Sequence, residues 1–288
     1  MVGMVTQTLR SQPALDIGAY LARIGYTGPV EPTLATLRGL VTAHLTHIPF
    51  ENLDPLMGIP VADLGAGALG TKLVQRARGG YCFEQNGLLA YALAELGYDV
   101  APLSARVVWM RPEGVDAPTT PLTHQLLAVR VPGDPRRYLV DVGFGGQTLT
   151  APIEFVPGLV QPTPNEPYRV GVRGDEYFLE TLIGDAWQPV YVFADVVRPA
   201  IDLQVGSWYV STHPESIFVV GLTASMIIDG ARWNLRGRHL AIHRPGEPTE
   251  RVRFENASQV LALLMNTFGL DVGGIGDVHQ RITEVLDT

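Results

Sequence analysis

Apolar residues recur three and four positions apart along the first part of the chain, which is the spacing of one buried face of an α-helix. Residues 17–24 and 34–45 follow this spacing. The Glu-Pro dipeptide at 31–32 predicts that the second helix begins there, because proline suits a first helical turn. A further helix is predicted over 88–96, with Gly97 as its C-cap. The first part of the chain is therefore predicted to be helical.

After Tyr98 the pattern changes to short runs rich in β-branched and large apolar residues, which is typical of strands. The turn sequence PGDP at 132–135 predicts a hairpin between the two runs that flank it. Closely spaced antiparallel strands of this kind predict a barrel or a sandwich. The predicted strands are 100–110, 125–131, 137–142, 169–172, 177–181 and 188–193.

From Asp202 onward strands and helices are mixed. Residues 218–228 and 239–243 are predicted as strands, and residues 258–268 as a helix. The order of helical, β and mixed segments indicates an α+β protein of several domains. The predicted boundaries are a helical region 1–97, a β region 98–200 and a mixed α/β region 201–288.

Composition narrows the classes of partner. The chain has 288 residues, 46% of them hydrophobic, and a formal net charge of −8. This acidic balance argues against nucleic acid as a partner, because no basic stripe is available to neutralise phosphates. The longest apolar run, 218–228, is interrupted by Gly221 and Thr223 and is too short to span a membrane. A globular protein with no membrane partner is expected.

Residues 1–13 lack the basic-then-apolar order of a signal peptide. Cys82 is the only cysteine, so no internal disulfide is possible and nothing favours a secreted fold. A cytoplasmic location is the expectation.

Cys82 is preceded by two glycines and followed by a helical run, where the N–H groups of a helix start favour a thiolate. A histidine within hydrogen-bonding reach can take the proton of such a thiol, and a carboxylate can hold the imidazole in place. His124 and Asp141 follow at the start and the end of predicted strands that a hairpin would bring together. Spacing alone leaves open that Cys82 is a buried structural thiol.

Five motifs stand out along the chain: IPFENL at 48–53, RGGYCFEQN at 78–86, TH at 123–124, VDVGFG at 140–145 and STHPESIF at 211–218. With these motifs, in this order, the sequence resembles the arylamine N-acetyltransferase family in its prokaryotic form, over about 48–218. The resemblance implies an N-terminal helical bundle, a central antiparallel β-barrel, a C-terminal α/β lid and a Cys-His-Asp site like that of cysteine proteases.

The resemblance also implies a reaction. Cys82 would be acetylated by acetyl-CoA, with His124 and Asp141 as its catalytic partners, and an arylamine or arylhydrazine would then take the acetyl group. This would be a ping-pong reaction of xenobiotic metabolism, with acetyl-CoA as co-substrate. Within the family motifs, Glu51 and Arg78 are expected to form a buried pair that orients the Cys82 loop.

The family also implies which residues contact the two substrates. Phe50 and Phe218 are candidates for the acceptor pocket, because flat apolar walls suit an aromatic amine. The candidate contacts to the co-substrate are Trp109, Thr123, Gly143, Phe144 and Gly145.

Two other functions use the same residues differently. An amide synthase would take its acyl group from a carrier-bound thioester and ignore free acetyl-CoA. A non-catalytic protein would bind aromatic molecules in an apolar pocket beside an inert thiol. His44 and His47 have roughly the spacing of a helical metal pair, but no third ligand is apparent, so no metal is expected.

Overall fold

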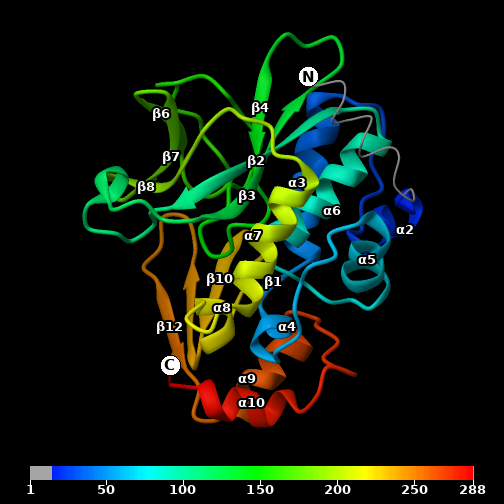
Figure 1. Ribbon diagram of the computed structural model, residues 1–288, viewed down its shortest axis with the longest axis vertical. Coiled ribbons are helices and arrows are strands. Elements are labelled where there is room, and N and C mark those ends of the chain that lie inside the picture. Colours follow the sequence, from blue (N-terminus) through cyan, green and yellow to red (C-terminus); the bar gives the residue numbers. More distant parts are fainter. Residues whose placement is uncertain (1–14, 288) are drawn as a thin grey trace.

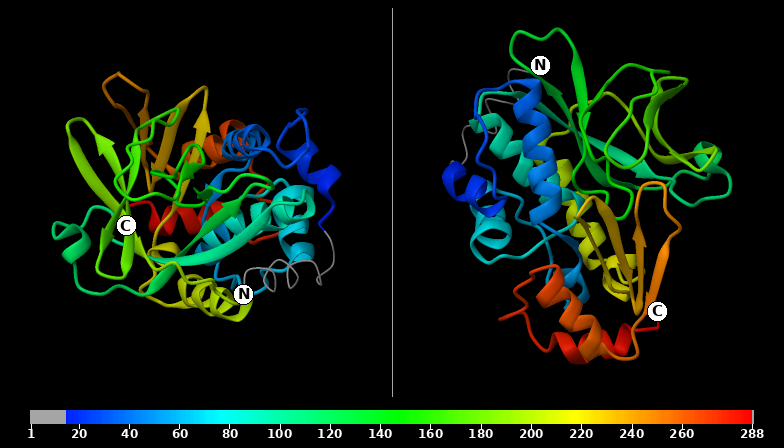
Figure 2. Two further views of the ribbon diagram at one scale, coloured as in Figure 1. Left: turned by 90° about the horizontal axis from the view of Figure 1, so that it is seen from above. Right: turned by 180° about the vertical axis from the view of Figure 1, so that it is seen from behind.

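The computed structural model describes residues 15–287 of the chain (Figure 1). The prediction for residues 1–13 lies outside this range. The β-rich part lies at one end of the molecule and the C-terminal helices at the other, in both Figure 1 and Figure 2. No helix within 15–287 is long and apolar enough to cross a membrane.

The N-terminal part is helical, as predicted. The 17–24 helix begins after Asp16, whose carboxylate accepts a hydrogen bond from the N–H of Ala19. The second helix begins at Leu34, two residues after Pro32, because the side chain of Thr33 caps it by accepting from the N–H of Thr36. The elements are α2 (Ile17–Arg23), α3 (Leu34–His47), α4 (Leu53–Leu56), α5 (Ala66–Leu69), the π-helical turn η1 (Gly70–Gln75) and α6 (Cys82–Glu95).

Helix α6 is the central helix of this part, and nearly all of its residues are buried. It begins six residues before the predicted start, at Cys82 itself. It ends at Glu95, one residue earlier than predicted, and Leu96 rather than Gly97 is the C-cap. Gly97 follows with a φ of 93°, a left-handed conformation that favours glycine. Helix α6 packs on β2 and β3 of the neighbouring sheet, so its first residue lies beside these strands.

The central strands form one seven-stranded sheet in the order β5-β4-β3-β2-β8-β7-β6, with every named pair antiparallel. Bridges from Pro157 to Val170 and from Gln161 to Tyr168 connect the segment after β5 to β6 and nearly close the sheet into a barrel. The strands are β2 (Asp99–Val107), β3 (Leu122–Arg130), β4 (Arg137–Val140), β5 (Ile153–Glu154), β6 (Tyr168–Arg173), β7 (Glu176–Ile183) and β8 (Ala186–Phe193).

The predicted strand 100–110 is three residues too long at its C-terminal end. The backbone leaves the sheet after Val107, and Met110 takes a positive φ of 60° that a strand does not allow. The 3₁₀ turn η2 (Gly114–Asp116) follows in the Pro-rich loop. The predicted hairpin is confirmed, because β3 and β4 pair directly, with Arg130 opposite Arg137 at the turn.

A second, five-stranded sheet has the order β1-β9-β10-β11-β12, so the short β1 of the helical part joins strands from the C-terminal third. Helix α7 runs from beside β3 of the barrel toward α8, and α9, η3 and α10 lie at the end of the molecule remote from the barrel (Figures 1 and 2). The elements are β1 (Phe50–Glu51), α7 (Ala200–Thr212), α8 (Ile217–Val220), β9 (Thr223–Ile228), β10 (Ala231–Arg236), β11 (His239–His243), β12 (Glu250–Arg253), α9 (Ala257–Ala262), η3 (Leu263–Thr267) and α10 (Val278–Val285).

The prediction of one strand over 218–228 is wrong in its first half. Residues 217–220 form the short helix α8, whose N-cap Ser216 accepts a hydrogen bond from the N–H of Phe218. A strand begins only at Thr223. Apolar β-branched residues favour a strand locally, but here a side-chain cap outweighs that preference.

Three hydrophobic clusters form the core, and they do not follow the predicted boundaries strictly. Leu53 and Leu56 of the helical part belong to the C-terminal cluster. Leu203 and Val210 of α7 belong to the N-terminal cluster. The third cluster fills the barrel. The division at residues 97 and 200 therefore stays a prediction, because the parts exchange core residues.

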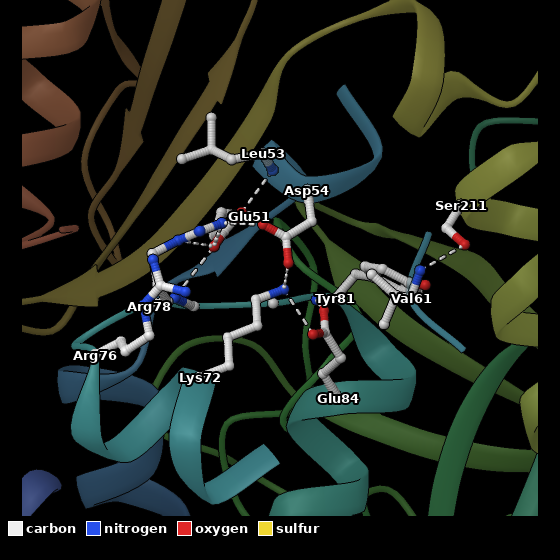
Figure 3. Close-up of polar contacts among 12 residues, drawn as sticks. Glu51, Leu53, Asp54, Val61, Lys72, Arg76, Arg78, Tyr81, Glu84 and Ser211 are labelled. Carbon is white, nitrogen blue, oxygen red and sulfur yellow. Dashed lines mark hydrogen bonds and ion pairs between the residues drawn. The ribbon is translucent and has the colours of Figure 1, made fainter. Parts of the chain in front are cut away.

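A buried ion pair ties β1 to the loop before α6 (Figure 3). Arg78 Nε and Nη2 donate to Glu51 Oε1 at 3.0 and 2.8 Å, and both residues are 1% exposed. The same oxygen accepts from the N–H of Gly79, and Asp54 takes a further bond from Arg78 Nη2 at 2.8 Å. The predicted pair is thus present, and it fixes the loop that leads to Cys82.

Glu51→Ala is expected to lower the free energy of unfolding by about 3–5 kcal/mol, because it leaves the Arg78 guanidinium buried with half of its partners removed. Chemical denaturation measures this. Glu250→Ala is the matched control: its pair with Arg244 is solvent-exposed, at 2.9 Å, and its loss should cost less than about 1 kcal/mol. Equal losses in the two variants would contradict the assignment.

Candidate active site

Cys82 is the first residue of α6 and is 3% exposed. Its Sγ donates to the carbonyl oxygen of Thr123 at 3.5 Å. The two preceding glycines allow this placement by their lack of side chains. A Cβ on Gly79 would lie 2.0 Å from the carbonyl oxygen of Pro49, and one on Gly80 would lie 2.5 Å from Glu84 Oε2. The close packing of this loop brings the thiol to the edge of the barrel.

His124 and Asp141 meet across the β3–β4 hairpin. His124 lies near the start of β3 and Asp141 directly follows β4, so the antiparallel pairing places them together. His124 Nε2 is 2.7 Å from Asp141 Oδ2, and both residues are buried. The expectation that a hairpin joins these two ends is confirmed.

Asp141 is held by three further hydrogen bonds. Its Oδ1 accepts from Asn86 Nδ2 and from the N–H of Gly143, both at 2.9 Å. Its carbonyl oxygen accepts from Thr148 Oγ1 at 2.8 Å. A Cβ on Gly143 would lie 2.7 Å from the Cα of Cys82, so glycine is required for the loop after Asp141 to pack against the nucleophile candidate.

Asn86 is a residue to which the sequence analysis gave no role. Besides binding Asp141, its Nδ2 donates to the carbonyl oxygen of Gln125 at 2.7 Å, and its Oδ1 accepts from the N–H of Val142 at 3.0 Å. Asn86 lies one turn after Cys82 on α6 and so joins the helix of the thiol to the strands of the other two residues. Its position in the motif at 78–86 was the available signal.

The electrostatics of the site favour a charged imidazole. Burial alone would lower the pKa of His124, but the Asp141 carboxylate and a hydrogen bond with Cys82 outweigh burial and raise that pKa to about 10. Burial alone would raise the pKa of Asp141, but His124, Asn86 and Gly143 hold it below its ordinary value. Since Nε2 faces the carboxylate, Nδ1 is the ring nitrogen left to exchange a proton with a thiol.

A cavity of about 430 Å³ opens onto this site. Nine of the ten predicted site residues line it, and the tenth, Asp141, lies behind His124 with an exposure of 1%. The nine lining residues are Phe50, Cys82, Trp109, Thr123, His124, Gly143, Phe144, Gly145 and Phe218.

Aromatic rings form much of the cavity wall. The Phe50 and Phe218 rings meet edge to face with centroids 5.9 Å apart. The His124 ring lies against Phe144 at 5.1 Å and against Tyr191 at 4.9 Å. A mostly apolar space with aromatic walls suits a planar aromatic molecule held beside the Cys82 thiol.

Arg236 was missed from the sequence because it lies in none of the five motifs. Among the described residues that line the cavity, it is the one arginine or lysine, and its side chain is exposed. Arg236 can therefore offer a positive charge, at the rim of the cavity, to an anionic group of a ligand.

His44 pairs with two neighbouring side chains. Its Nδ1 is 2.9 Å from the Tyr20 hydroxyl, and its Nε2 is 2.6 Å from Gln85 Oε1. Gln85 Nε2 donates to the carbonyl oxygens of Pro49 and Gly80, which fixes the amide so that its oxygen accepts from His44. Both ring nitrogens are thus occupied. Within 15–287 no group of three or more His, Cys, Asp or Glu side chains is placed to hold a metal ion.

Comparison with known proteins identifies the family. Residues 33–277 match the family model described as N-acetyltransferase. The arylamine N-acetyltransferase of Mycolicibacterium smegmatis is 58% identical over 96% of this chain and 100% of its own length. That of Escherichia coli (strain K12) is 37% identical, over 92% of this chain and 91% of its own length. The chain belongs to the arylamine N-acetyltransferase family.

Solved structures of the family share the fold of this enzyme. The M. smegmatis arylamine N-acetyltransferase superposes with a TM-score of 0.92 at 58% identity, covering 96% of this chain and 100% of that one. The Mycobacterium marinum arylamine N-acetyltransferase in complex with CoA gives a TM-score of 0.91 at 54% identity, covering 94% of this chain and 99% of that one. The resemblance read from the five motifs is confirmed.

Asp141→Asn is expected to change how stability depends on pH. The pKa of His124 is raised in the folded state, so the stability gained from its charged form is fully present below about pH 6.5 and is lost as pH rises through about 10. In Asp141→Asn the carboxylate that opposes burial is gone, so the pKa of His124 is no longer raised. Denaturant unfolding between pH 6 and 10 measures this: wild type should lose stability over this range, and parallel curves for the two proteins would contradict the assignment.

Proposed function

We propose that this family member transfers an acetyl group from acetyl-CoA to the nitrogen of an arylamine or arylhydrazine, through an acetyl-Cys82 intermediate. The observation that carries the proposal is the placement of Cys82 and His124 on the wall of one cavity, with His124 Nε2 2.7 Å from Asp141 Oδ2 behind it. The M. marinum relative, whose structure holds CoA, supports the choice of donor.

The first half-reaction begins from a thiolate and an imidazolium. The Cys82 thiolate attacks the carbonyl carbon of the acetyl thioester, and a tetrahedral intermediate forms. When this intermediate collapses, the bond from carbon to the CoA sulfur breaks. His124 gives its proton to that sulfur, so CoA leaves as a thiol and the imidazole becomes neutral. Asp141 keeps the imidazole oriented throughout.

The second half-reaction uses the neutral imidazole as a base. The amine nitrogen attacks the acetyl carbon on Cys82, and His124 accepts the proton that the nitrogen loses. The carbon–sulfur bond breaks, the N-acetyl product leaves, and the thiolate–imidazolium pair is restored. An arylamine is largely unprotonated near neutral pH, so its lone pair is available for this attack.

The cavity residues divide into two proposed groups. Phe50 and Phe218 form the wall against which an aromatic acceptor stacks, as their edge-to-face contact supports. The co-substrate would lie along Trp109, Thr123, Gly143, Phe144 and Gly145, all of which line the cavity. Arg236 at the rim would bind a phosphate of the nucleotide part.

Brief incubation of the enzyme with acetyl-CoA is expected to add one acetyl group to the intact protein, as measured by mass spectrometry. The adduct should be absent in Cys82→Ala and should disappear when an arylamine is added. Absence of any adduct on folded wild-type protein would overturn the proposed donor. An amide synthase would then be tested with carrier-bound acyl thioesters, and a binding protein would leave Cys82 unmodified by both donors.

Arg236→Gln is expected to weaken CoA binding about fivefold, which corresponds to the loss of one exposed charged contact of about 1 kcal/mol. Isothermal titration of CoA measures the Kd directly, and the difference should shrink at high salt. Arg244→Gln is the matched control, because Arg244 is also exposed but pairs with Glu250 away from the cavity. Equal Kd values for Arg236→Gln and wild type would exclude this contact.

A further inference from the structure

Lys72 is the only lysine of the chain, and its ammonium group lies between two carboxylates. Its Nζ is 2.7 Å from Asp54 Oδ2 and 2.6 Å from Glu84 Oε1. The Lys72 side chain is 16% exposed and that of Glu84 is 1% exposed. Figure 3 shows Lys72 extending from η1 into the space between Asp54 and Glu84.

Glu84 connects this ion pair to the first turn of α6. Its second oxygen, Oε2, accepts a hydrogen bond from the N–H of Tyr81 at 3.2 Å. Tyr81 directly precedes Cys82 and Glu84 follows it by two residues. The Glu84 carboxylate therefore bonds to the backbone just before the thiol from a position just after it in the helix. Glu84 does not line the catalytic cavity. Any effect it has on the thiol must therefore pass through this turn or through its charge.

The charge of Glu84 depends on Lys72. Burial raises the pKa of Glu84 to about 7, and Lys72 opposes that rise. The nearby Arg78 donates to Glu51 and Asp54 instead. Lys72 is thus the one cation that the described contacts place on Glu84.

Once ionised, a Glu84 carboxylate without Lys72 as its partner would oppose the thiolate. Both anions would lie within the same helical turn, where like charges disfavour each other. On the barrel side, the pair of His124 with Asp141 is left unchanged by the loss of Lys72.

We propose that Lys72 is a positioning residue for the nucleophile: it neutralises and orients Glu84, so that the first turn of α6 holds Cys82 toward His124 without a competing negative charge. This inference rests on the proposed role of Cys82 as nucleophile. Lys72 itself touches neither the cavity nor the reacting atoms.

The test measures the rate at which iodoacetamide alkylates Cys82 between pH 6 and 9, in the full-length protein. Cys82 is the only cysteine, so intact mass reports its reaction directly. The variants are Lys72→Met, Lys72→Arg and the double variant Lys72→Met/Glu84→Gln. Arg76→Met is the matched control, because Arg76 follows the same π-helical turn but donates to the carbonyl oxygen of Gly273.

Without Lys72 the pKa of Glu84 rises further, because its cationic partner is gone, so Glu84 ionises only toward the upper end of this pH range. Lys72→Met is therefore expected to match wild type within about twofold at pH 6 and to react progressively more slowly as pH rises, by up to about tenfold at pH 9. Lys72→Arg keeps the charge and should stay within about threefold of wild type. The double variant removes both charges and keeps an oxygen for the N–H of Tyr81, so its rate should recover to within about threefold. Arg76→Met should react as wild type does.

A wild-type rate for Lys72→Met at pH 9 would overturn the inference, and so would a double variant as slow as Lys72→Met. A purely structural role would lower the melting temperature of Lys72→Met without this pH dependence. If Lys72→Met does not fold, Glu84→Met and Glu84→Gln replace it: the first should react slowly, the second at the wild-type rate, and equal rates would overturn the inference.

Failure of this inference is distinguishable from failure of the proposed function. If wild-type Cys82 accepts an acetyl group but Lys72→Met alkylates normally, only the inference fails. If wild-type Cys82 accepts no acetyl group, the proposed function fails, whatever the alkylation rates are.

Discussion

The first turns of α6, a helix buried over nearly its whole length, carry three consecutive polar side chains that need partners, and most of the site depends on those partners. Glu84, Gln85 and Asn86 are each no more than 1% exposed. An unpaired polar group at such depth is costly, so each one requires partners from elsewhere in the fold. Glu84 binds η1, Gln85 binds α3 and the loop at 79–80, and Asn86 binds the barrel.

These three sets of hydrogen bonds fix the first turns of α6, and with them Cys82, against three other segments of the fold. The helix cannot shift along its axis or rotate without breaking bonds to two other segments at once. The glycines of the loops reinforce this, because Gly79 and Gly143 allow backbone contacts that any side chain would block. The candidate site is thus pre-organised by buried polar pairing, while the cavity beside it keeps mostly apolar walls.

The local pattern of apolar and polar residues predicted most helices and strands. It failed at 217–220 and at the start of α3, where a capping side chain decides the conformation. The apolar run at 218–228 suits a strand by composition, yet Ser216 begins a short helix within it. The same cause delays α3, which begins after Thr33 rather than at Pro32. In both cases a single side-chain hydrogen bond to the backbone decides the start of a helix, and hydrophobic periodicity carries no information about that bond.

By itself the sequence determined the family, the order of helical and β segments, and the identity of Cys82, His124 and Asp141 as candidate catalytic residues, because these are encoded in short motifs and local periodicity. Only the tertiary structure decided the partners of the buried polar groups, the place of Arg236 at the cavity rim and the use of the single lysine. The physical reason is sequence separation: Asn86 meets Asp141 across 55 positions, and His44 meets Gln85 across 41. Such contacts exist only after the hydrophobic clusters have brought distant segments together.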